Sequence, residues 1–223
     1  MTVQIIGMLI GAYLIGSIPF GFIIVKITSG EDIRTIQSGR TGGTNTWRAA
    51  GFIPGFSTAF LDIGKAASAV TIARVLPAFS NPWLLILVPI LVIIGNNYSF
   101  FMVSRDKDGK VNFGGGAGGA ACLGGAVGLW WPSGLIILGV GILIYYFVGY
   151  ASVTTMWVAL GATLIFSYRA VFLGSPWAFA VYGLAAEGLL VLSLLPNIRR
   201  LLAGTERLHG FRAKQIKNQE KFS

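Results

Sequence analysis

Long apolar runs constrain this chain more than any other feature of its sequence. An α-helix needs roughly 20 apolar residues to cross a hydrocarbon core about 30 Å thick. Five runs come near or exceed this length, and two weaker runs carry charged residues or many glycines; the clear runs are 3–26, 82–103, 132–148, 151–168 and 176–195, and the weaker ones 52–76 and 114–131. The sequence therefore predicts an all-α integral membrane protein with seven transmembrane helices, the fourth of them short or re-entrant.

The composition agrees with this interpretation and excludes several function classes. Hydrophobic residues make up 54% of the 223 residues and charged residues only 11%, against about 25% charged in a soluble domain. Cys122 is the one cysteine and His209 the one histidine, so neither a disulfide framework nor a His/Cys metal cluster can form. We expect no metal, no cofactor and no Ser-His-Asp catalysis.

The distribution of lysine and arginine predicts the orientation, because cytoplasmic loops retain basic residues. With the N-terminus outside and the C-terminus inside, 14 of the 17 basic residues are cytoplasmic. They lie in the first loop, the third loop and the tail: Lys26, Arg34, Arg40, Arg48, Arg105, Lys107, Lys110, Arg199, Arg200, Arg207, Arg212, Lys214, Lys217 and Lys221. Topology thus accounts for most of the net charge of +9, and we expect no nucleic-acid partner.

The chain is expected to form one transmembrane domain, residues 1–196, followed by a basic cytoplasmic tail, residues 197–223. The first apolar run is too long for the core of a signal peptide and lacks the usual small-residue cleavage site, so we interpret it as the first span. No repeat at a fixed spacing is evident.

The first cytoplasmic loop, residues 38–48, combines glycines, hydroxyls, an amide and two arginines. Glycines allow backbone N–H groups to approach an anion, and arginine can bind two oxygens at once. The loop therefore suits a phosphate. The alternative is a flexible loop whose arginines only enforce orientation.

Asp62 and Lys65, three residues apart in the second predicted helix, share one helix face. They form either an ion pair inside the bundle or part of a substrate site. Composition does not choose between these two interpretations.

Several segments resemble the bacterial acyl-phosphate:glycerol-3-phosphate acyltransferases over almost the whole chain. The segments are Gly16–Gly21, Ser38–Gly39, Gly42–Arg48, Phe60–Asp62 with Lys65, and Asn197–Glu206. The resemblance implies a seven-helix inner-membrane enzyme that moves an acyl chain from acyl phosphate to the sn-1 hydroxyl of glycerol 3-phosphate, without metal or cofactor.

The resemblance also implies site residues. If the chain is active, the catalytic residues are Ser38, Arg48 and Asn197. The residues implied in substrate and phosphate binding are Gly39, Gly42, Thr44, Asn45, Lys107, Lys110 and Ser152.

The chain departs from the family pattern where phosphate-binding charges are expected. Asn96 replaces a histidine, and Leu194, Leu195 and Pro196 replace basic residues and a glutamate before Asn197. The family's lysine-rich glycine loop has two possible registers here: 113–118, in which both lysines are lost to Gly114 and Ala117, or 107–110, in which Lys107 and Lys110 survive beside new carboxylates.

These losses favour a catalytically degenerate relative, an accessory or structural, lipid-contacting subunit of a larger membrane complex. Its expected partners are membrane lipids and other membrane-protein subunits. The alternative is an active acyltransferase that uses glycerol 3-phosphate and acyl phosphate to make lysophosphatidic acid for phospholipid synthesis.

Overall fold

The structure is a computed structural model that describes residues 1–105, 108–209 and 211. Most of this part is α-helical: α1 (Thr2–Ser17), α2 (Phe20–Ser29), α3 (Gly43–Ala50), α4 (Phe52–Arg74), α5 (Pro82–Leu85), α6 (Leu87–Asn97), α7 (Gly119–Leu129), α8 (Pro132–Phe147), α9 (Ala151–Leu173) and α10 (Trp177–Leu202). Three short 3₁₀ turns, Ile33–Thr35, Pro77–Phe79 and Phe100–Met102, and two strands, β1 (Val103–Arg105) and β2 (Val111–Phe113), complete it.

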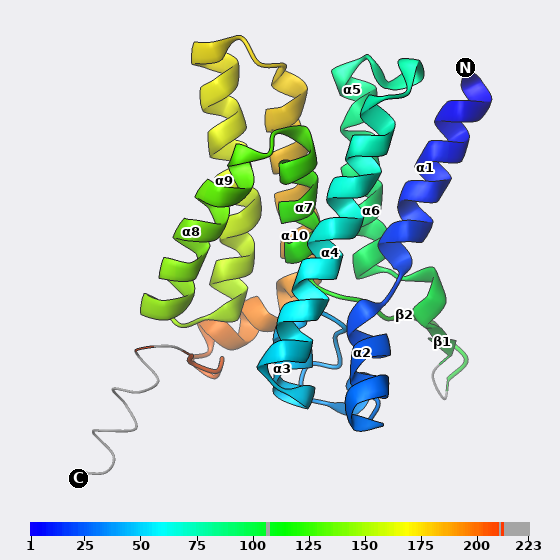
Figure 1. Cartoon of the computed structure of the whole chain (residues 1–223). Helices are drawn as coiled ribbons and strands as arrows, with labels where there is room; N and C mark the ends of the chain where they lie inside the picture. Colours follow the sequence, from blue (N-terminus) through cyan, green and yellow to red (C-terminus); the bar gives the residue numbers. More distant parts are fainter. Residues whose placement is uncertain (106–107, 210, 212–223) are drawn as a thin grey trace.

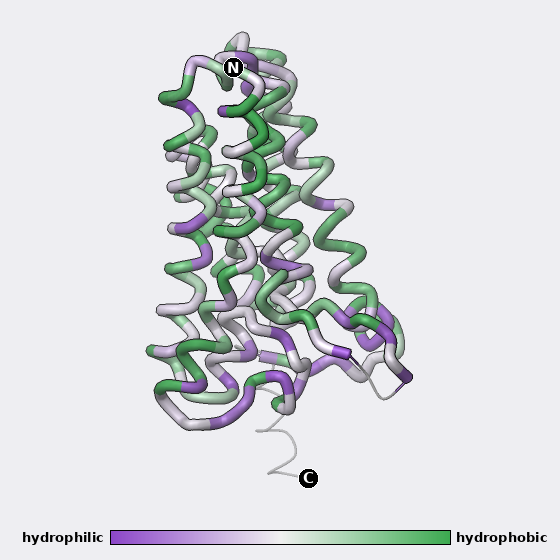
Figure 2. The backbone as a smooth tube through the Cα atoms, turned by 90° about the vertical axis from the view of Figure 1, so that its right-hand side faces the viewer, coloured by the Kyte–Doolittle hydropathy of each residue, from purple (hydrophilic) through white to green (hydrophobic). Residues whose placement is uncertain are grey.

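The long helices run side by side along one axis (Figure 1). The N-terminus lies at one end, and α3, the β-hairpin and the C-terminal segment lie at the other. Hydrophilic segments concentrate toward this second end (Figure 2). Four helical segments are long and apolar enough to cross a membrane: Thr2–Ser29, Pro82–Met102, Ala151–Leu173 and Trp177–Leu202.

The first predicted span is not one continuous helix. It breaks between α1 and α2 at Ile18 and Pro19, where Ile18 is extended with φ −61° and ψ 115°. A residue before proline is driven out of the helical region, and proline has no N–H to donate. Lys65 Nζ, 3.0 Å away, donates to the Ile18 carbonyl.

The all-α prediction missed a small antiparallel sheet. Strands β1 and β2 pair Val103 with Phe113 and Arg105 with Val111. The connection between them includes Gly109, whose φ of +78° favours glycine. Three-residue strands are too short to show a period in the sequence, so the hairpin had no detectable signal.

Helix α7 has 11 residues and is therefore about 16 Å long, well short of the bilayer core. Its glycines allow close packing, since a Cβ on Gly124 would overlap the Ile63 carbonyl of α4. Arg74 Nη1 donates to the carbonyls of Gly128 (2.8 Å) and Leu129 (3.2 Å), which end the helix. A buried helix end therefore keeps its carbonyls satisfied.

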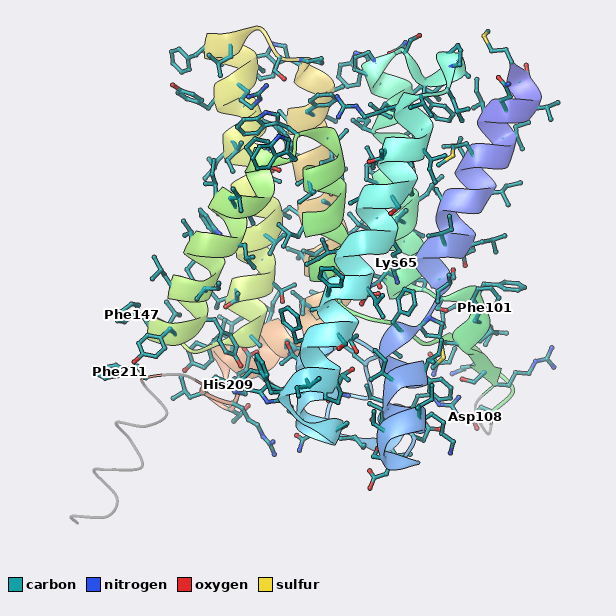
Figure 3. The ribbon with its side chains drawn as sticks, viewed as in Figure 1. Lys65, Phe101, Asp108, Phe147, His209 and Phe211 are labelled. Carbon is teal, nitrogen blue, oxygen red and sulfur yellow. The ribbon has the colours of Figure 1, made fainter. Side chains whose placement is uncertain are left out.

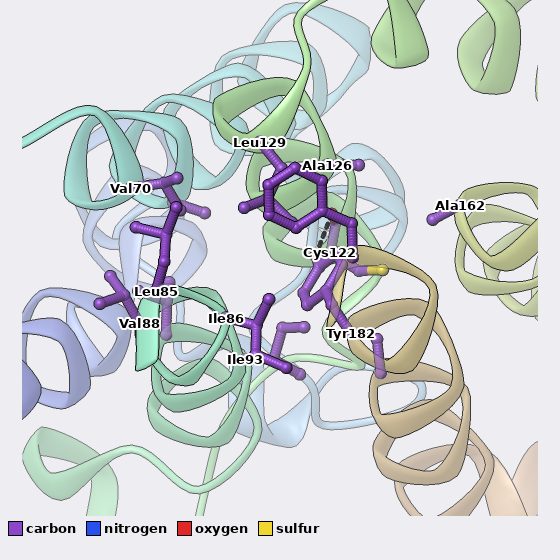
Figure 4. Close-up of a cluster of buried hydrophobic side chains, with 14 of the residues drawn as sticks. Val70, Leu85, Ile86, Val88, Ile93, Cys122, Ala126, Leu129, Ala162 and Tyr182 are labelled. Carbon is purple, nitrogen blue, oxygen red and sulfur yellow. Dashed lines mark hydrogen bonds between the residues drawn. The ribbon is translucent and has the colours of Figure 1, made fainter. Parts of the chain in front are cut away.

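The apolar core lies between α4, α6, α7, α9 and α10 (Figure 4). Tyr182, fully buried, donates its hydroxyl to the Cys122 carbonyl at 2.6 Å. Cys122 itself is a buried free thiol within this core.

Helices α1 and α6 cross closely at Gly95, where a Cβ would overlap the Tyr13 carbonyl oxygen. Gly95→Ala should therefore destabilise the protein by about 1–3 kcal/mol through overpacking, measured as a lower melting temperature in detergent. Gly11→Ala is the matched control, because a Cβ on Gly11 meets no atom within 4 Å. Equal melting temperatures for the two variants would contradict the crossing.

Candidate functional site

A cavity of about 310 Å³ is lined by the first loop and by α3, α4, α6, α7, α8, α9 and α10. These elements meet toward the end of the bundle that carries α3 (Figure 1). Polar residues from five separate segments meet there: the first loop with α3, then α4, α6, α9 and α10. Its polar and glycine lining includes Ser38, Arg40, Gly42, Gly43, Thr44, Asn45, Arg48, Asp62, Asn96, Gly118, Gly119, Ser152, Thr155 and Asn197.

Asn45 organises the first loop. Its buried amide nitrogen donates to the carbonyls of Arg40 (2.9 Å) and Ile36 (3.0 Å), and at 3.4 Å to that of Ile33. These bonds hold the loop against the first turn of α3. Asn45, which the resemblance implied as a substrate ligand, thus uses its amide N–H groups to shape the loop.

Two helix N-termini border the cavity. Gly42 is the N-cap of α3, and Gly118, with φ +87°, is the N-cap of α7. Both line the cavity together with the residues that follow them. The first N–H groups of a helix have no partner within the helix, and its dipole is positive there. This end of the cavity therefore favours an anion such as phosphate.

Arg40 and Arg48 add two full positive charges to the lining. Burial lowers the pKa of both guanidinium groups, yet arginine, with a usual pKa above about 12, stays protonated. Within the described residues, neither forms an ion pair with a carboxylate, whereas Lys65 and Arg34 do. The cavity is therefore electropositive.

Lys65, Asp62 and Asn96 form a buried polar cluster beside the cavity, with Lys65 labelled in Figure 3. Lys65 Nζ lies 2.6 Å from Asp62 Oδ1 and donates to Asn96 Oδ1 at 2.9 Å. The ion-pair alternative of the sequence analysis is confirmed. Asn96, at the family's histidine position, accepts a hydrogen bond here and carries no charge.

The C-terminal segment folds back onto the site, which sequence analysis did not anticipate. Ser152 Oγ donates to Glu206 Oε2 at 2.6 Å, and the His209 amide donates to the Gly149 carbonyl at 2.8 Å. His209 Nε2 lies 2.8 Å from Arg48 Nη2 (Figure 3). Glu206 stood in a quoted motif, but nothing in the sequence distinguished His209.

The structure brings seven of the ten implied site residues to the cavity: Ser38, Gly42, Thr44, Asn45, Arg48, Ser152 and Asn197. Gly39 lies next to the lining, with φ +67°. Lys110 lies beside the β-hairpin, away from the cavity lining, and Lys107 falls outside the described residues. The glycine loop of the 113–118 register faces the cavity through Ala117 and Gly118, whereas Lys110 is not among the lining residues.

Aromatic side chains form one wall of the cavity. Trp47, Phe52 and Phe56 line it and are also exposed on the outer surface of the bundle. Their rings contact one another in sequence, at 5.5 Å and 6.1 Å between centroids. A polar site thus borders directly on an apolar surface.

Comparisons with known proteins now identify the family. The profile described as Glycerol-3-phosphate acyltransferase matches residues 6–204. The chain belongs to the glycerol-3-phosphate acyltransferase family. Glycerol-3-phosphate acyltransferase 2 of Moorella thermoacetica is 34% identical over 92% of this chain and 97% of that protein. The Thermus thermophilus glycerol-3-phosphate acyltransferase is 36% identical over 91% of this chain and 94% of that protein.

Solved structures agree. The crystal structure of PlsY (YgiH), an integral membrane glycerol 3-phosphate acyltransferase, in its glycerol 3-phosphate form has a TM-score of 0.80 and 28% identity, covering 95% of this chain and 98% of that one. Its lysophosphatidic acid form has a TM-score of 0.77. The present chain is therefore a mostly helical integral membrane protein of the acyltransferase family.

The prediction of a catalytically degenerate accessory subunit is wrong. Relatives named for the acyltransferase match nearly the whole chain, and the similar structures are substrate and product forms. The accessory-subunit prediction considered only the positions at which the family pattern has charged residues and this chain has lost them. It took no account of the electropositive cavity that Arg40, Arg48 and two helix N-termini form together.

His209 should titrate below its usual pKa of 6.5, because burial and the positive charges of Arg48 and Arg207 disfavour the imidazolium, despite the opposing charge of Glu206. Since only neutral imidazole accepts from Arg48, the contact contributes its full stability above pH about 6.5, the usual pKa, and is lost as the pH falls through the lowered pKa of the folded protein. NMR titration of this one histidine measures the pKa directly. Arg48→Ala should raise it toward 6.5; an unchanged pKa would contradict the contact.

Proposed function

We propose that this protein transfers an acyl group from acyl phosphate to the sn-1 hydroxyl of glycerol 3-phosphate. The hydroxyl oxygen attacks the acyl carbon, and the bond from that carbon to the phosphate oxygen breaks. The products are lysophosphatidic acid and inorganic phosphate, and the departing phosphate takes up the proton of the attacking hydroxyl. Neither a metal nor another cofactor is required by this balance.

The observation that carries the proposal is an electropositive cavity bordering an apolar wall. Both substrates carry a phosphate, and one also carries an acyl chain. Two arginines and two helix N-termini suit the phosphates, and Trp47, Phe52 and Phe56 offer the chain an apolar surface. Holding two reactants in one cavity lowers the entropic cost of their reaction, and fixed cations stabilise charge on the departing phosphate.

The proposal assigns roles to the implied residues. Arg48 and Asn197 bind and orient phosphate oxygens, and the hydroxyls of Ser38 and Thr44 donate to them. The Ser152 hydroxyl, which donates to Glu206, holds the C-terminal segment against the cavity. Gly39 and Gly42 allow the loop to approach the anion, and Asn45 holds that loop in place.

Arg48→Ala should reduce kcat/KM by about 100-fold or more, the usual effect of removing one stabilising donor. Purified protein supplied with acyl phosphate and glycerol 3-phosphate gives the rate as released inorganic phosphate. Arg34→Ala is the matched control, because Arg34 lies just before this loop, in the turn Ile33–Thr35, and pairs with Asp32 at 2.6 Å.

The control should retain activity within about threefold, as expected for an exposed ion pair worth no more than about 1 kcal/mol. Complementation of a bacterial strain that lacks its own acyltransferase provides a second readout. Wild-type protein that is folded but neither releases phosphate nor supports growth would refute the proposed function.

The proposal includes the location and topology: seven spans in the bacterial inner membrane, N-terminus outside, with residues 1–196 as the membrane domain and 197–223 as a basic cytoplasmic tail. Each predicted range contains helix in the described chain. The first loop, the hairpin and the C-terminal segment share one end of the bundle, which supports a common side (Figure 1). Helix α10 continues to Leu202, so the tail begins as helix.

Cysteine labelling of intact cells tests this topology. An impermeant maleimide should label Ser80→Cys, between α4 and α5, and should not label Glu31→Cys, after α2; both positions are exposed. Cys122 is buried and should not react. Labelling of Glu31→Cys by the reagent outside the cell would contradict the proposed orientation.

A further inference from the structure

The glycine loop that faces the cavity has no basic residue. Residues 114–118 read Gly-Gly-Gly-Ala-Gly, whereas the resemblance implied two lysines there. Lys110 is not part of the cavity lining. If this chain binds phosphate at the loop, the positive charge has to come from another segment.

Arg40 reaches the loop from the first cytoplasmic segment. Its Nη1 donates to Ser193 Oγ at 2.7 Å and lies 3.4 Å from the Gly116 carbonyl, while Nη2 donates to the Ser193 carbonyl. The neighbouring Thr41 amide donates to the Gly115 carbonyl at 3.1 Å. The guanidinium group is therefore held beside the glycine loop, on the cavity wall.

The partners of Arg40 are all neutral. Two carbonyls and one hydroxyl receive its hydrogen bonds, and no carboxylate of the described chain pairs with it. By contrast, Lys65 in the neighbouring polar cluster is neutralised by Asp62. A half-buried charge without a counter-charge is costly, and an anionic ligand offsets that cost.

We propose that Arg40 binds the phosphate group of a substrate at the glycine loop, replacing the lysines that the loop lacks. This assignment rests on the proposed acyltransferase function and adds a residue that is absent from the site residues implied by the resemblance. The phosphate belongs to glycerol 3-phosphate or to acyl phosphate, and separate KM values for the two substrates distinguish these sources.

Arg40→Gln tests the charge. Loss of a charge-assisted contact should raise one of the two KM values about 10- to 100-fold, with little change in the other. Arg40→Lys keeps the charge and should retain more of the affinity than Arg40→Gln. An unchanged pair of KM values in Arg40→Gln would overturn the proposal.

Ser193→Ala is the control for a merely structural role. It removes the hydroxyl that accepts a hydrogen bond from Arg40 Nη1, but it leaves the Arg40 guanidinium group and the Ser193 carbonyl in place. Its KM values should stay within about threefold of wild type, since a neutral hydrogen bond contributes less than a charge-assisted one. A KM increase in Ser193→Ala equal to that in Arg40→Gln would mean that the Arg40–Ser193 contact only holds the first loop against α10. That result would refute phosphate binding by Arg40.

Charge relocation gives the decisive readout. Ala117 lines the cavity in the glycine loop, so Ala117→Lys in the Arg40→Gln background restores a cation there. We expect at least a tenfold recovery of kcat/KM, which a structural role for Arg40 does not predict. A double variant that melts like wild type but recovers no activity would overturn the proposal.

Calorimetry separates this proposal from the proposed function. If the folded wild type shows no acyl transfer, the proposed acyltransferase function is refuted. Titration with glycerol 3-phosphate and with inorganic phosphate then still tests whether Arg40 binds a phosphate group. Wild type that binds either anion at least tenfold more tightly than Arg40→Gln supports the assignment. Equal affinity of the two proteins for both anions overturns it.

Discussion

The buried ammonium group of Lys65 joins the parts of the structure that meet below the apolar core. It pairs with Asp62 on its own helix, donates to Asn96 on α6 and donates to the Ile18 carbonyl freed by the break between α1 and α2. Charges inside a membrane protein are tolerated only when they are paired and hydrogen-bonded. This cluster therefore lets three segments bring polar groups into the buried interior of the bundle, and the cavity lies directly beside it.

From that cluster outward, the site is built from backbone as much as from side chains. The Asn96 carbonyl accepts the Gly116 amide at 2.7 Å, and the Gly115 carbonyl accepts the Thr41 amide. A Cβ on Gly115 would overlap the Asn97 carbonyl, so only glycine permits this approach. The first loop, the end of α6 and the start of α7 are thus held together, and their amides and arginines face one space that attracts phosphate.

Two expectations failed for different physical reasons. The hairpin was missed because three-residue strands have no measurable period. The accessory-subunit interpretation failed because it treated each lost charge as a loss to the site. An electrostatic site depends on the total field of nearby groups. In this cavity Arg40 and two helix N-termini add to the positive charge of Arg48, which the resemblance had already implied.

The sequence by itself determined the membrane character, the mostly helical fold, the polar first loop and the family resemblance, because apolar run length and motif spacing are local properties. Only the tertiary structure decided that Arg40 lies against Ser193 and Gly116, that His209 contacts Arg48, and that Lys110 lies away from the cavity. Arg40 and Ser193 are 153 residues apart. No local pattern specifies such a contact, since it follows from how α3, α7 and α10 pack around one cavity.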